Sequence, residues 1–268
     1  DIGSNDGTTL NFYEDTELLI GIDPVSSKFK QKYPKNSITY NDFFNLNISS
    51  EIKKKYIEMD IITSFAMFYD LEDPVEFAKN IHSILSKDGI WCLEQSYLPS
   101  MIEKNAFDTI CHEHLEYYAL KQIELIMSEA SLKVIDVKLT DANGGSFLLI
   151  VAKKDSNYKE NKNVKDLREY ENKFFDNKYI YKEFCQRVSN IKLKLLSTIE
   201  NLNNNNKNVY CLGASTKGNV ILQYFNLTNK HIKSIGEVNK SKFGCVTPGS
   251  NIPIVNQEEI INDPDGYF

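Results

Sequence analysis

The sequence has no long apolar run, no excess of basic residues and no paired cysteine motif, and each absence excludes a class of protein. None of its apolar runs approaches the ~20 residues that a helix needs to cross a bilayer, and no signal peptide is visible. The formal net charge of -6 disfavours a nucleic-acid partner, which normally requires a basic face. The five cysteines are odd in number and form no C-x-x-C pair, as expected of reduced cytosolic thiols. We therefore expect a cytoplasmic protein without a membrane or nucleic-acid partner.

The composition that is present is that of an ordinary globular protein. With 268 residues, of which 41% are hydrophobic and 25% charged, the chain is able to bury a substantial core in one large or two medium domains. There is no initiator Met, and only Asp1 and Ile2 precede the first glycine turn. We expect that these two residues end a buried strand, and that the sequence is a fragment cut short at both ends.

The chain opens on Asp1-Ile-Gly-Ser-Asn-Asp-Gly7, a glycine turn that leads into a helix predicted over residues 8–13. Gly3 and Gly7 tolerate positive φ and let a ligand approach the backbone. The amide groups that begin the helix attract a carboxylate, and Asp1 and Asp6 are placed to hold an ammonium group. The turn therefore predicts a site for the methionyl part of S-adenosylmethionine (SAM), formed by Asp1, Gly3, Ser4, Asn5 and Gly7.

A second strand is predicted over residues 17–24, and Asp23 lies at its end. An acidic residue that ends a second strand about 20 residues after a glycine turn is placed to accept hydrogen bonds from ribose hydroxyls. A glycine turn followed by such an acidic residue also binds NAD, but this turn does not have the G-x-G-x-x-G spacing of dinucleotide-binding proteins. An NAD-type oxidoreductase and a non-enzymatic nucleotide-binding module are therefore the alternatives. Further cofactor contacts are expected from Asp42, Phe43 and Ser64.

Strands and helices alternate as far as residue 154. A short strand is expected at residues 38–40 and a central strand, buried on both faces, at residues 60–66. A helix over 75–86, a strand over 90–94 and an amphipathic helix over 122–131 follow. The last two strands, 133–139 and 146–153, are joined by Asn143-Gly-Gly, which indicates an antiparallel hairpin. Parallel β/α units that end in such a hairpin describe the sheet of a class I methyltransferase, an α/β Rossmann-like fold.

The second half has a different pattern. Residues 155–207 are rich in Lys, Glu and Asn and are expected to form one long connecting helix. A smaller α/β domain is expected over 208–268, with a strand at 209–212, a loop at 213–218, a helix at 219–225, a strand at 232–237 and a helix close to the end. We expect the ligand cleft between this domain and the methyltransferase domain of residues 1–154, with Lys217 facing it. The loop suits a diphosphate, although a purely structural strand-to-helix turn explains it equally well.

Cys111-His112-Glu113-His114 gathers two of the four histidines and a carboxylate. Three interpretations are open. In the first interpretation, Cys111, His112 and His114 are zinc ligands, although side chains one or two residues apart on a helix do not point toward one metal ion. A polar turn capped by its own side chains is the second. In the third, a histidine takes a proton beside a carbonyl while the carboxylate orients the ring.

Four segments together resemble the sugar C-methyltransferases that act on nucleotide-linked 4-keto hexoses. They are Asp1-Ile-Gly-Ser-Asn-Asp-Gly7, Phe107-Asp-Thr-Ile-Cys-His-Glu-His114, Asn143-Gly-Gly-Ser146 and Gly213-Ala-Ser-Thr-Lys-Gly218, and they span nearly the whole chain in the order typical of the family. The resemblance implies a SAM-dependent enzyme that methylates the carbon next to a keto group, and an N-terminal zinc-binding module ahead of this stretch. Within this stretch it implies no metal.

The resemblance also implies roles for individual residues. His114 is the favoured general base and Glu113 its partner, with His112 beside them. Tyr69, Tyr117 or Tyr118 is available to stabilise the enolate, although each is more often a packing residue. The nucleotide sugar would contact Asn143, Gly144, Ser146, Gly213, Ala214, Lys217 and Gly218. The chain departs from the family at Cys111, where a tyrosine is usual, at Phe68-Tyr69-Asp70, where a histidine is common, and at Leu148, which replaces an arginine.

Overall fold

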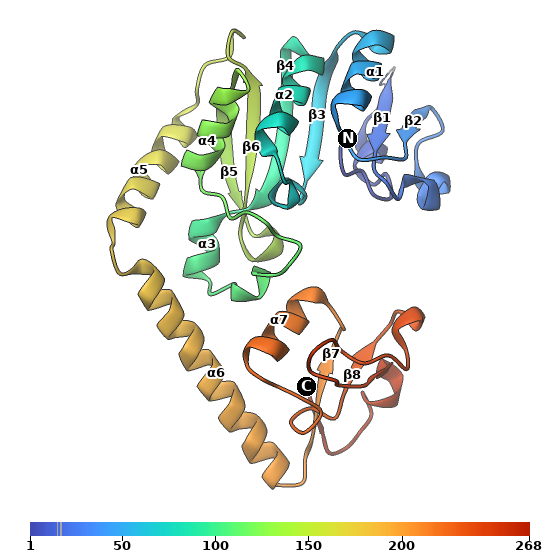
Figure 1. Ribbon diagram of the computed structural model, residues 1–268, viewed down its shortest axis with the longest axis vertical. Helices are drawn as coiled ribbons and strands as arrows, with labels where there is room; N and C mark the ends of the chain where they lie inside the picture. The colour runs from blue at the N-terminus through green and yellow to red at the C-terminus, as the bar shows by residue number, and fades with distance from the viewer. Residues whose placement is uncertain (15, 17) are drawn as a thin grey trace. The chain divides into compact units, whose positions relative to one another are not determined.

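The computed structural model describes residues 1–268 except 15 and 17, so the predicted first residue of the second strand, Glu17, lies outside the described residues (Figure 1). The chain divides into two compact units. The first comprises Asp1–Lys104 and Leu115–Lys178, and the second comprises Asn105–His114 and Tyr179–Phe268.

The first unit is built on a mixed sheet. Its strands β3 (Met59–Phe65), β4 (Leu85–Ser96), β6 (Ser146–Lys153) and β5 (Leu132–Thr140) lie in the order β3-β4-β6-β5. β3 and β4 are parallel, whereas β6 is antiparallel to both β4 and β5. The strands β1 (Leu19–Ile22) and β2 (Ser37–Tyr40) form a further parallel pair. Ile2 connects the two parts, because it forms parallel bridges with Ile22 and with Ser64. The expected class I methyltransferase sheet with an antiparallel hairpin is confirmed.

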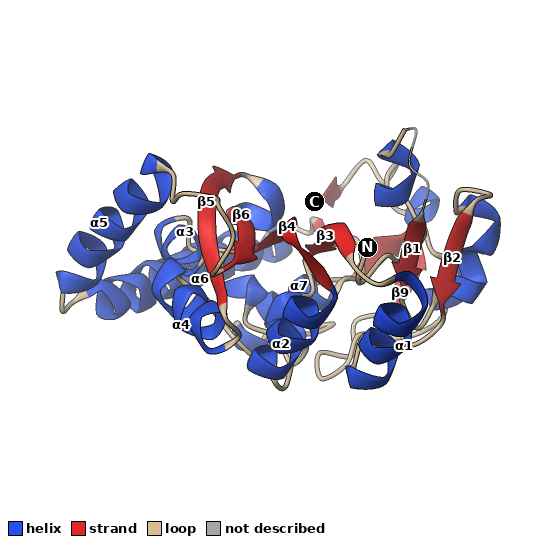
Figure 2. Cartoon of the chain, turned by 90° about the horizontal axis from the view of Figure 1, so that it is seen from above, coloured by secondary structure: helices blue, strands red, loops and turns tan. Residues whose placement is uncertain are grey.

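Helices cover one face of these strands. Figure 2 shows α1 (Leu46–Tyr56), α2 (Pro74–Ile84) and α4 (Leu120–Glu129) along that face, and α3 (Leu98–Glu103) and α5 (Lys162–Asp176) complete the unit. Side-chain caps begin two of the helices: the Asn45 side chain accepts from the amides of Asn47 and Ile48, and that of Asp73 accepts from the amide of Glu76. Such caps satisfy backbone donors that a helix start leaves unpaired, each contributing about 1 kcal/mol.

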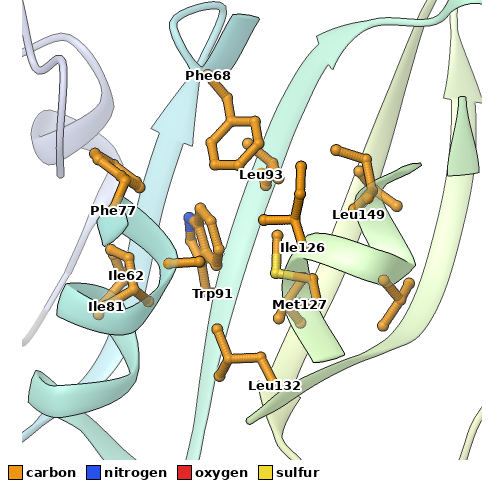
Figure 3. Close-up of a cluster of buried hydrophobic side chains, with 14 of the residues drawn as sticks. Ile62, Phe68, Phe77, Ile81, Trp91, Leu93, Ile126, Met127, Leu132 and Leu149 are labelled. Atoms are coloured by element: carbon orange, nitrogen blue, oxygen red, sulfur yellow. The ribbon is translucent and has the colours of Figure 1, made fainter. Parts of the chain in front are cut away.

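The core of the first unit lies between β4 and the helices α2 and α4 (Figure 3). Alternate residues of β4 are buried, so Trp91 and Leu93 present their side chains to the same layer. Phe68 packs edge-on against Trp91 at a centroid distance of 5.7 Å. Trp91 Nε1 donates to Ser64 Oγ at 2.9 Å, which satisfies the indole N–H inside the core.

Two predictions near the N-terminus need correction. β3 is not buried on both faces, because Ile61 and Phe65 are 48% and 38% exposed. The exposed residues share one face of β3, whereas Ile62 and Ser64 lie on the opposite face and are 3% and 0% exposed, with Ile62 part of the core. The helix predicted over residues 8–13 is a single short 3-10 helix at Thr9–Phe12.

The predicted long connecting helix is two helices. α5 ends at Asp176, Asn177 is extended at φ -69° and ψ 98°, and α6 runs over Ile180–Asn204. α5 buries Val164 and Leu167 in the core of the first unit, whereas α6 belongs to the second unit. The unit boundary therefore falls between these helices rather than at residue 154 or 208, because each helix has an apolar face that packs on a different core.

The second unit contains a parallel sheet. Its strands β10 (Gly266–Tyr267), β7 (Asn208–Leu212), β8 (Ser234–Glu237) and β9 (Ile254–Asn256) lie in the order β10-β7-β8-β9. Helix α7 (Thr216–Tyr224) follows β7 directly. The helix expected close to the end is a short 3-10 helix at Gln257–Glu259.

Candidate functional site

The opening glycine turn, residues 3–7, keeps its backbone in the left-handed region at three positions. Gly3, Asn5 and Gly7 have φ values of 73°, 45° and 77°. The amides of Gly3 and Ser4 donate to the carbonyl of Ile22 at 2.9 and 3.3 Å, and the amide of Gly7 donates to the carbonyl of Ser4 at 2.7 Å. The turn is therefore fixed to the end of β1 by backbone bonds. We call residues 3–7 the donor turn.

Asn5 is held on both sides by side chains from elsewhere in the first unit. Its amide donates to Asp23 Oδ2 at 3.0 Å, and its carbonyl accepts from the Tyr33 hydroxyl at 2.8 Å. Tyr33 also shares a 2.8 Å hydrogen bond with Ser4 Oγ. The other oxygen of Asp23 accepts from the amide of Val25 at 2.8 Å. Each carboxylate oxygen has a second lone pair, so Asp23 retains acceptor capacity for a ligand hydroxyl.

Tyr33 is a residue of this site that the sequence analysis missed. Its ring fills the space beside two glycines, since a Cβ on Gly7 would lie 2.9 Å from the ring and one on Gly21 would lie 2.6 Å from it. Gly21 in the middle of β1 was the available signal, because a glycine inside a strand often marks a close approach of other atoms.

The two carboxylates expected to hold an ammonium group are engaged within the protein. Asp1 Oδ1 accepts from the Thr63 hydroxyl at 2.6 Å. Asp6 accepts from the Thr8 hydroxyl at 2.6 Å and pairs with Lys32 at 3.0 Å. The hydrogen bonds from Thr8 and Lys32 lower the pKa of Asp6 to about 2. Both carboxylates thus have partners within the protein, and their role in holding an ammonium group stays a prediction.

The remaining predicted cofactor residues divide into exposed and buried ones. Asp42 and Phe43 follow β2 and are exposed, Phe43 by 72% of its surface. Both side chains are accessible to a ligand. Ser64, in contrast, is fully buried and accepts the Trp91 hydrogen bond, so its side chain belongs to the core. Its assignment as a cofactor contact stays a prediction.

The segment Asn105–His114, which carries the candidate base, packs in the second unit. Phe107 stacks on Phe225 with a centroid distance of 5.4 Å, and Arg187 Nε donates to Asn105 Oδ1 at 2.7 Å. These contacts fix the segment on α6 and on the residue after α7. The base candidate is therefore carried by the unit that also holds the loop of residues 213–218.

The two histidines of this segment differ in their surroundings. The side chain of His112 is 83% exposed and lies 3.9 Å from Glu113 Oε1, an exposed pair that contributes little. His114 is half-buried. The next residue, Leu115, belongs to the first unit, and its amide donates to the carbonyl of Tyr69 at 3.0 Å. The chain that leaves His114 is thus anchored to the loop after β3.

The three candidate tyrosines also differ. Tyr69 is 8% exposed and Tyr118 only 4% exposed, whereas Tyr117 is half-buried. Tyr118 packs on Phe68 at a centroid distance of 5.6 Å, and burial raises the pKa of its phenol. Its hydroxyl has no hydrogen-bond partner among the described residues. Tyr118 is therefore a packing residue in this structure.

A pocket of about 620 Å³ in the second unit is lined by residues of the predicted acceptor-binding loop. Its lining includes Gly213, Ala214, Lys217 and Gly218, and also Asp108 from the segment that carries His114. Apolar residues of α6, β7 and α7 form the rest of the wall, among them Leu195, Ile199, Val209 and Leu222. The pocket combines apolar walls with polar groups at the loop, as ligand pockets usually do.

Glu237 fixes the loop of residues 213–218. Its Oε2 accepts from the amide of Ala214 at 3.0 Å, and its Oε1 accepts from the amides of Val238 and Asn239 at 2.7 and 3.0 Å. Lys242 completes the arrangement, since its Nζ donates to the carbonyl of Ala214 at 2.8 Å. The amides of Asn239 and Val238 lower the pKa of Glu237 to about 2. Glu237 thus holds the loop rather than offering a free carboxylate to a ribose.

The hairpin predicted to touch the substrate lies in the first unit. Asn143 and Gly144 are exposed in a turn with φ values of 52° and 89°. Ser146 is 1% exposed, and its hydroxyl donates to the carbonyl of Ala142 at 2.9 Å. Its side chain therefore stabilises the turn, and its assignment as a substrate ligand stays a prediction.

Neither a metal cluster nor a membrane helix is found in the described part of the chain. No group of at least three His, Cys, Asp or Glu residues there is arranged to hold a metal ion. None of the helices there is both long and apolar enough to cross a membrane. The zinc-binding module that the resemblance implies stays a prediction.

Two solved structures are similar to part of this chain at low identity. A SAM-dependent methyltransferase from Anabaena variabilis gives a TM-score of 0.46 at 13% identity, covering 57% of this chain and 75% of that protein. A putative methyltransferase from Bacillus halodurans gives a TM-score of 0.43 at 11% identity, covering 57% and 90%.

Family models and a curated relative match nearly the whole sequence. Residues 1–137, more than half of the 268, match a methyltransferase domain, and residues 141–268 match a C-methyltransferase C-terminal domain. C-methyltransferase NovU of Streptomyces niveus is 25% identical over 270 residues, which cover 100% of this chain and 64% of NovU. The chain thus spans less than two thirds of that relative. It belongs to the methyltransferase-domain family, and its second half is similar to the C-terminal domain of C-methyltransferases.

Proposed function

We infer that this chain transfers the methyl group of SAM to a carbon next to the keto group of a nucleotide-linked 4-keto sugar. The observation that carries the proposal is the position of the base candidate. His114 and the loop of residues 213–218 belong to one compact unit, and Asp108 of the His114 segment lines the same pocket as that loop. Because one unit carries both the base and the acceptor pocket, the distance between them does not depend on the other unit.

The donor turn supports SAM as the methyl source. Its glycines adopt the positive φ values that the turn requires, and Asp23 retains lone pairs for the ribose hydroxyls. Phe43 offers an exposed aromatic face at the end of β2, suited to packing on adenine. The match of residues 1–137 to a methyltransferase domain supports the same assignment.

The reaction needs a base and a stabilised enolate. His114 would take the proton from the carbon α to the keto group, and the electrons of that C–H bond would form the enolate. The enolate carbon would then attack the methyl group in line, and the sulfur would keep the electrons of the broken S–C bond. SAM thus becomes S-adenosylhomocysteine, and the keto group is restored. Tyr69 and Tyr117 are the candidates for stabilising the enolate oxygen.

Two measurements test the proposal. Calorimetry with SAM, S-adenosylhomocysteine and NAD should show binding of the first two and none of NAD. Incubation with a 4-keto sugar nucleotide in deuterated water, without SAM, should exchange the α proton. Binding of NAD in place of SAM would support an oxidoreductase instead, and SAM binding without exchange would mean a different acceptor.

A further inference from the structure

The Tyr33 hydroxyl fixes one peptide unit of the donor turn from inside the protein. It donates to the carbonyl of Asn5 at 2.8 Å. Because a phenol has one proton, the 2.8 Å contact with Ser4 must be a bond that the serine hydroxyl donates to the phenol oxygen. Tyr33 and Ser4 are 7% and 4% exposed, so this chain of bonds is shielded from water. The orientation of the Asn5 carbonyl is therefore set by buried groups.

The opposite side of the same peptide unit is an N–H group without an acceptor. A trans peptide is planar, and its C=O and N–H point in opposite directions. The Asn5 carbonyl points at Tyr33, so the amide of Asp6 points away from it. In the donor turn the amides of Gly3, Ser4, Asn5 and Gly7 each donate within the protein, whereas the structure shows no acceptor for that of Asp6 among the described residues.

The charge beside this amide is compensated. The Asp6 carboxylate pairs with Lys32 and accepts from the Thr8 hydroxyl and, at 3.3 Å, from the Thr8 amide. A neighbouring carboxylate without such partners would repel an anionic ligand. With Lys32 beside it, the Asp6 carboxylate adds little net charge next to this N–H group.

We propose that Tyr33 is a positioning residue that aims the Asp6 amide at the carboxylate of the methyl donor. The inference deepens the proposed function and rests on SAM binding at the donor turn. The ring of Tyr33 contributes as well, since it lies where side chains on Gly7 and Gly21 would have to be and so prevents the turn from collapsing toward β1. In this proposal Tyr33 acts on the donor only through the Asn5–Asp6 peptide.

The test compares two donors on two variants of the full chain. Tyr33→Phe keeps the ring and removes the hydroxyl. It should weaken SAM binding about 3- to 10-fold, because the Asn5–Asp6 peptide is no longer held in one orientation. Decarboxylated SAM lacks the anionic group, so its affinity should change less than twofold. Tyr97→Phe is the matched control: Tyr97 is 1% exposed, and its hydroxyl bonds to Glu171 at 3.0 Å. It should lower stability without changing either affinity.

A second readout does not depend on any ligand. Amide hydrogen exchange of residues 4–8, measured without donor, should be faster in Tyr33→Phe than in wild type and unchanged in Tyr97→Phe. Equal weakening of both donors, or unchanged SAM affinity together with unchanged exchange, overturns the assignment of Tyr33. If wild type binds no SAM, the proposed function fails, and faster exchange in Tyr33→Phe would still show that its hydroxyl holds the turn.

Discussion

At the scale of single residues, similar side chains differ because their surroundings differ. His112 and His114 are two positions apart, yet one is solvated and the other half-buried beside the residue that enters the first unit. A base gains catalytic effect only where it is fixed relative to the carbon from which it takes the proton. The burial of the two rings therefore favours His114.

Replacing each histidine by alanine should separate them. His114→Ala should lower kcat by about 10²–10⁴-fold, the usual contribution of a positioned general base, while SAM affinity stays unchanged. His112→Ala should change kcat by less than about threefold, because an exposed pair with Glu113 holds nothing in place. Solvent deuterium exchange into the keto sugar measures the proton step directly. Wild-type exchange in His114→Ala would mean that another group is the base.

Asp23 has two roles at the donor turn, and its substitution should affect both. Asp23→Ala removes the acceptor of the Asn5 amide and, with it, the proposed ribose contact. We expect a loss of SAM binding of about 1.5–3 kcal/mol, as for hydrogen bonds to a charged group. Asp23→Asn keeps one acceptor oxygen and should lose less. Titration calorimetry of both variants tests this order, and equal affinity of Asp23→Ala and wild type would exclude Asp23 from the site.

At the scale of elements, the loops that follow strands depend on carboxylates from neighbouring strands. Asp23, directly after β1, accepts a hydrogen bond from the amide of Asn5 in the donor turn. Glu237, at the end of β8, accepts one from the amide of Ala214 in the loop after β7. In both cases parallel strands end at the same edge of a sheet, so a side chain from one strand end reaches the loop of its neighbour.

The Glu237 arrangement predicts a pH dependence. The pKa of Glu237 is lowered to about 2 in the folded chain, so the unfolded state binds more protons between this value and the ordinary carboxyl pKa of ~4.3. The stabilisation is therefore fully present above pH ~4.3 and is lost as the pH falls toward 2. Glu237→Gln should unfold at lower urea concentration than wild type at pH 7, and the difference should shrink on acidification. A difference that stays constant with pH would contradict this role for the charge.

At the scale of the whole molecule, the second unit is assembled from two separate stretches of chain. Asn105–His114 leaves the first unit, packs on α6 and Phe225, and returns at Leu115. The core of each unit is made by its own strands and helices, with Trp91 and Leu93 central in the first (Figure 3). Chains with two such cores often unfold in more than one step.

Two core substitutions should therefore act on different unfolding transitions. Leu93→Ala removes a fully buried side chain of the first unit and should lower its free energy of unfolding by about 2–5 kcal/mol. Phe107→Ala removes the ring stacked on Phe225 and should lower the stability of the second unit instead. Calorimetric scans should show each variant shifting one transition. A single transition shifted equally by both variants would mean that the units unfold together.

Much of the local structure could be predicted because it is local. The hairpin at Asn143 requires residues that accept positive φ, the strand over Ser146–Lys153 has the β-rich pattern of a core strand, and the donor turn has glycines where its backbone needs them. These features depend on φ, ψ and side-chain type within a few neighbouring residues. The fold class and the residues of the donor turn were accordingly apparent from the sequence alone.

Only the tertiary structure decided which groups meet across long separations. Tyr33 forms a hydrogen bond with Asn5, 28 residues away in the sequence, and Trp91 forms one with Ser64, 27 residues away. Phe107 lies in the sequence between two stretches of the first unit, yet it packs on Phe225 in the second unit. No spacing encodes these pairs, because they follow from how strands pair and where each helix buries its apolar face. The sequence by itself determined a methyltransferase sheet with its glycine turn, whereas packing decided which side chains hold that turn and which unit carries His114.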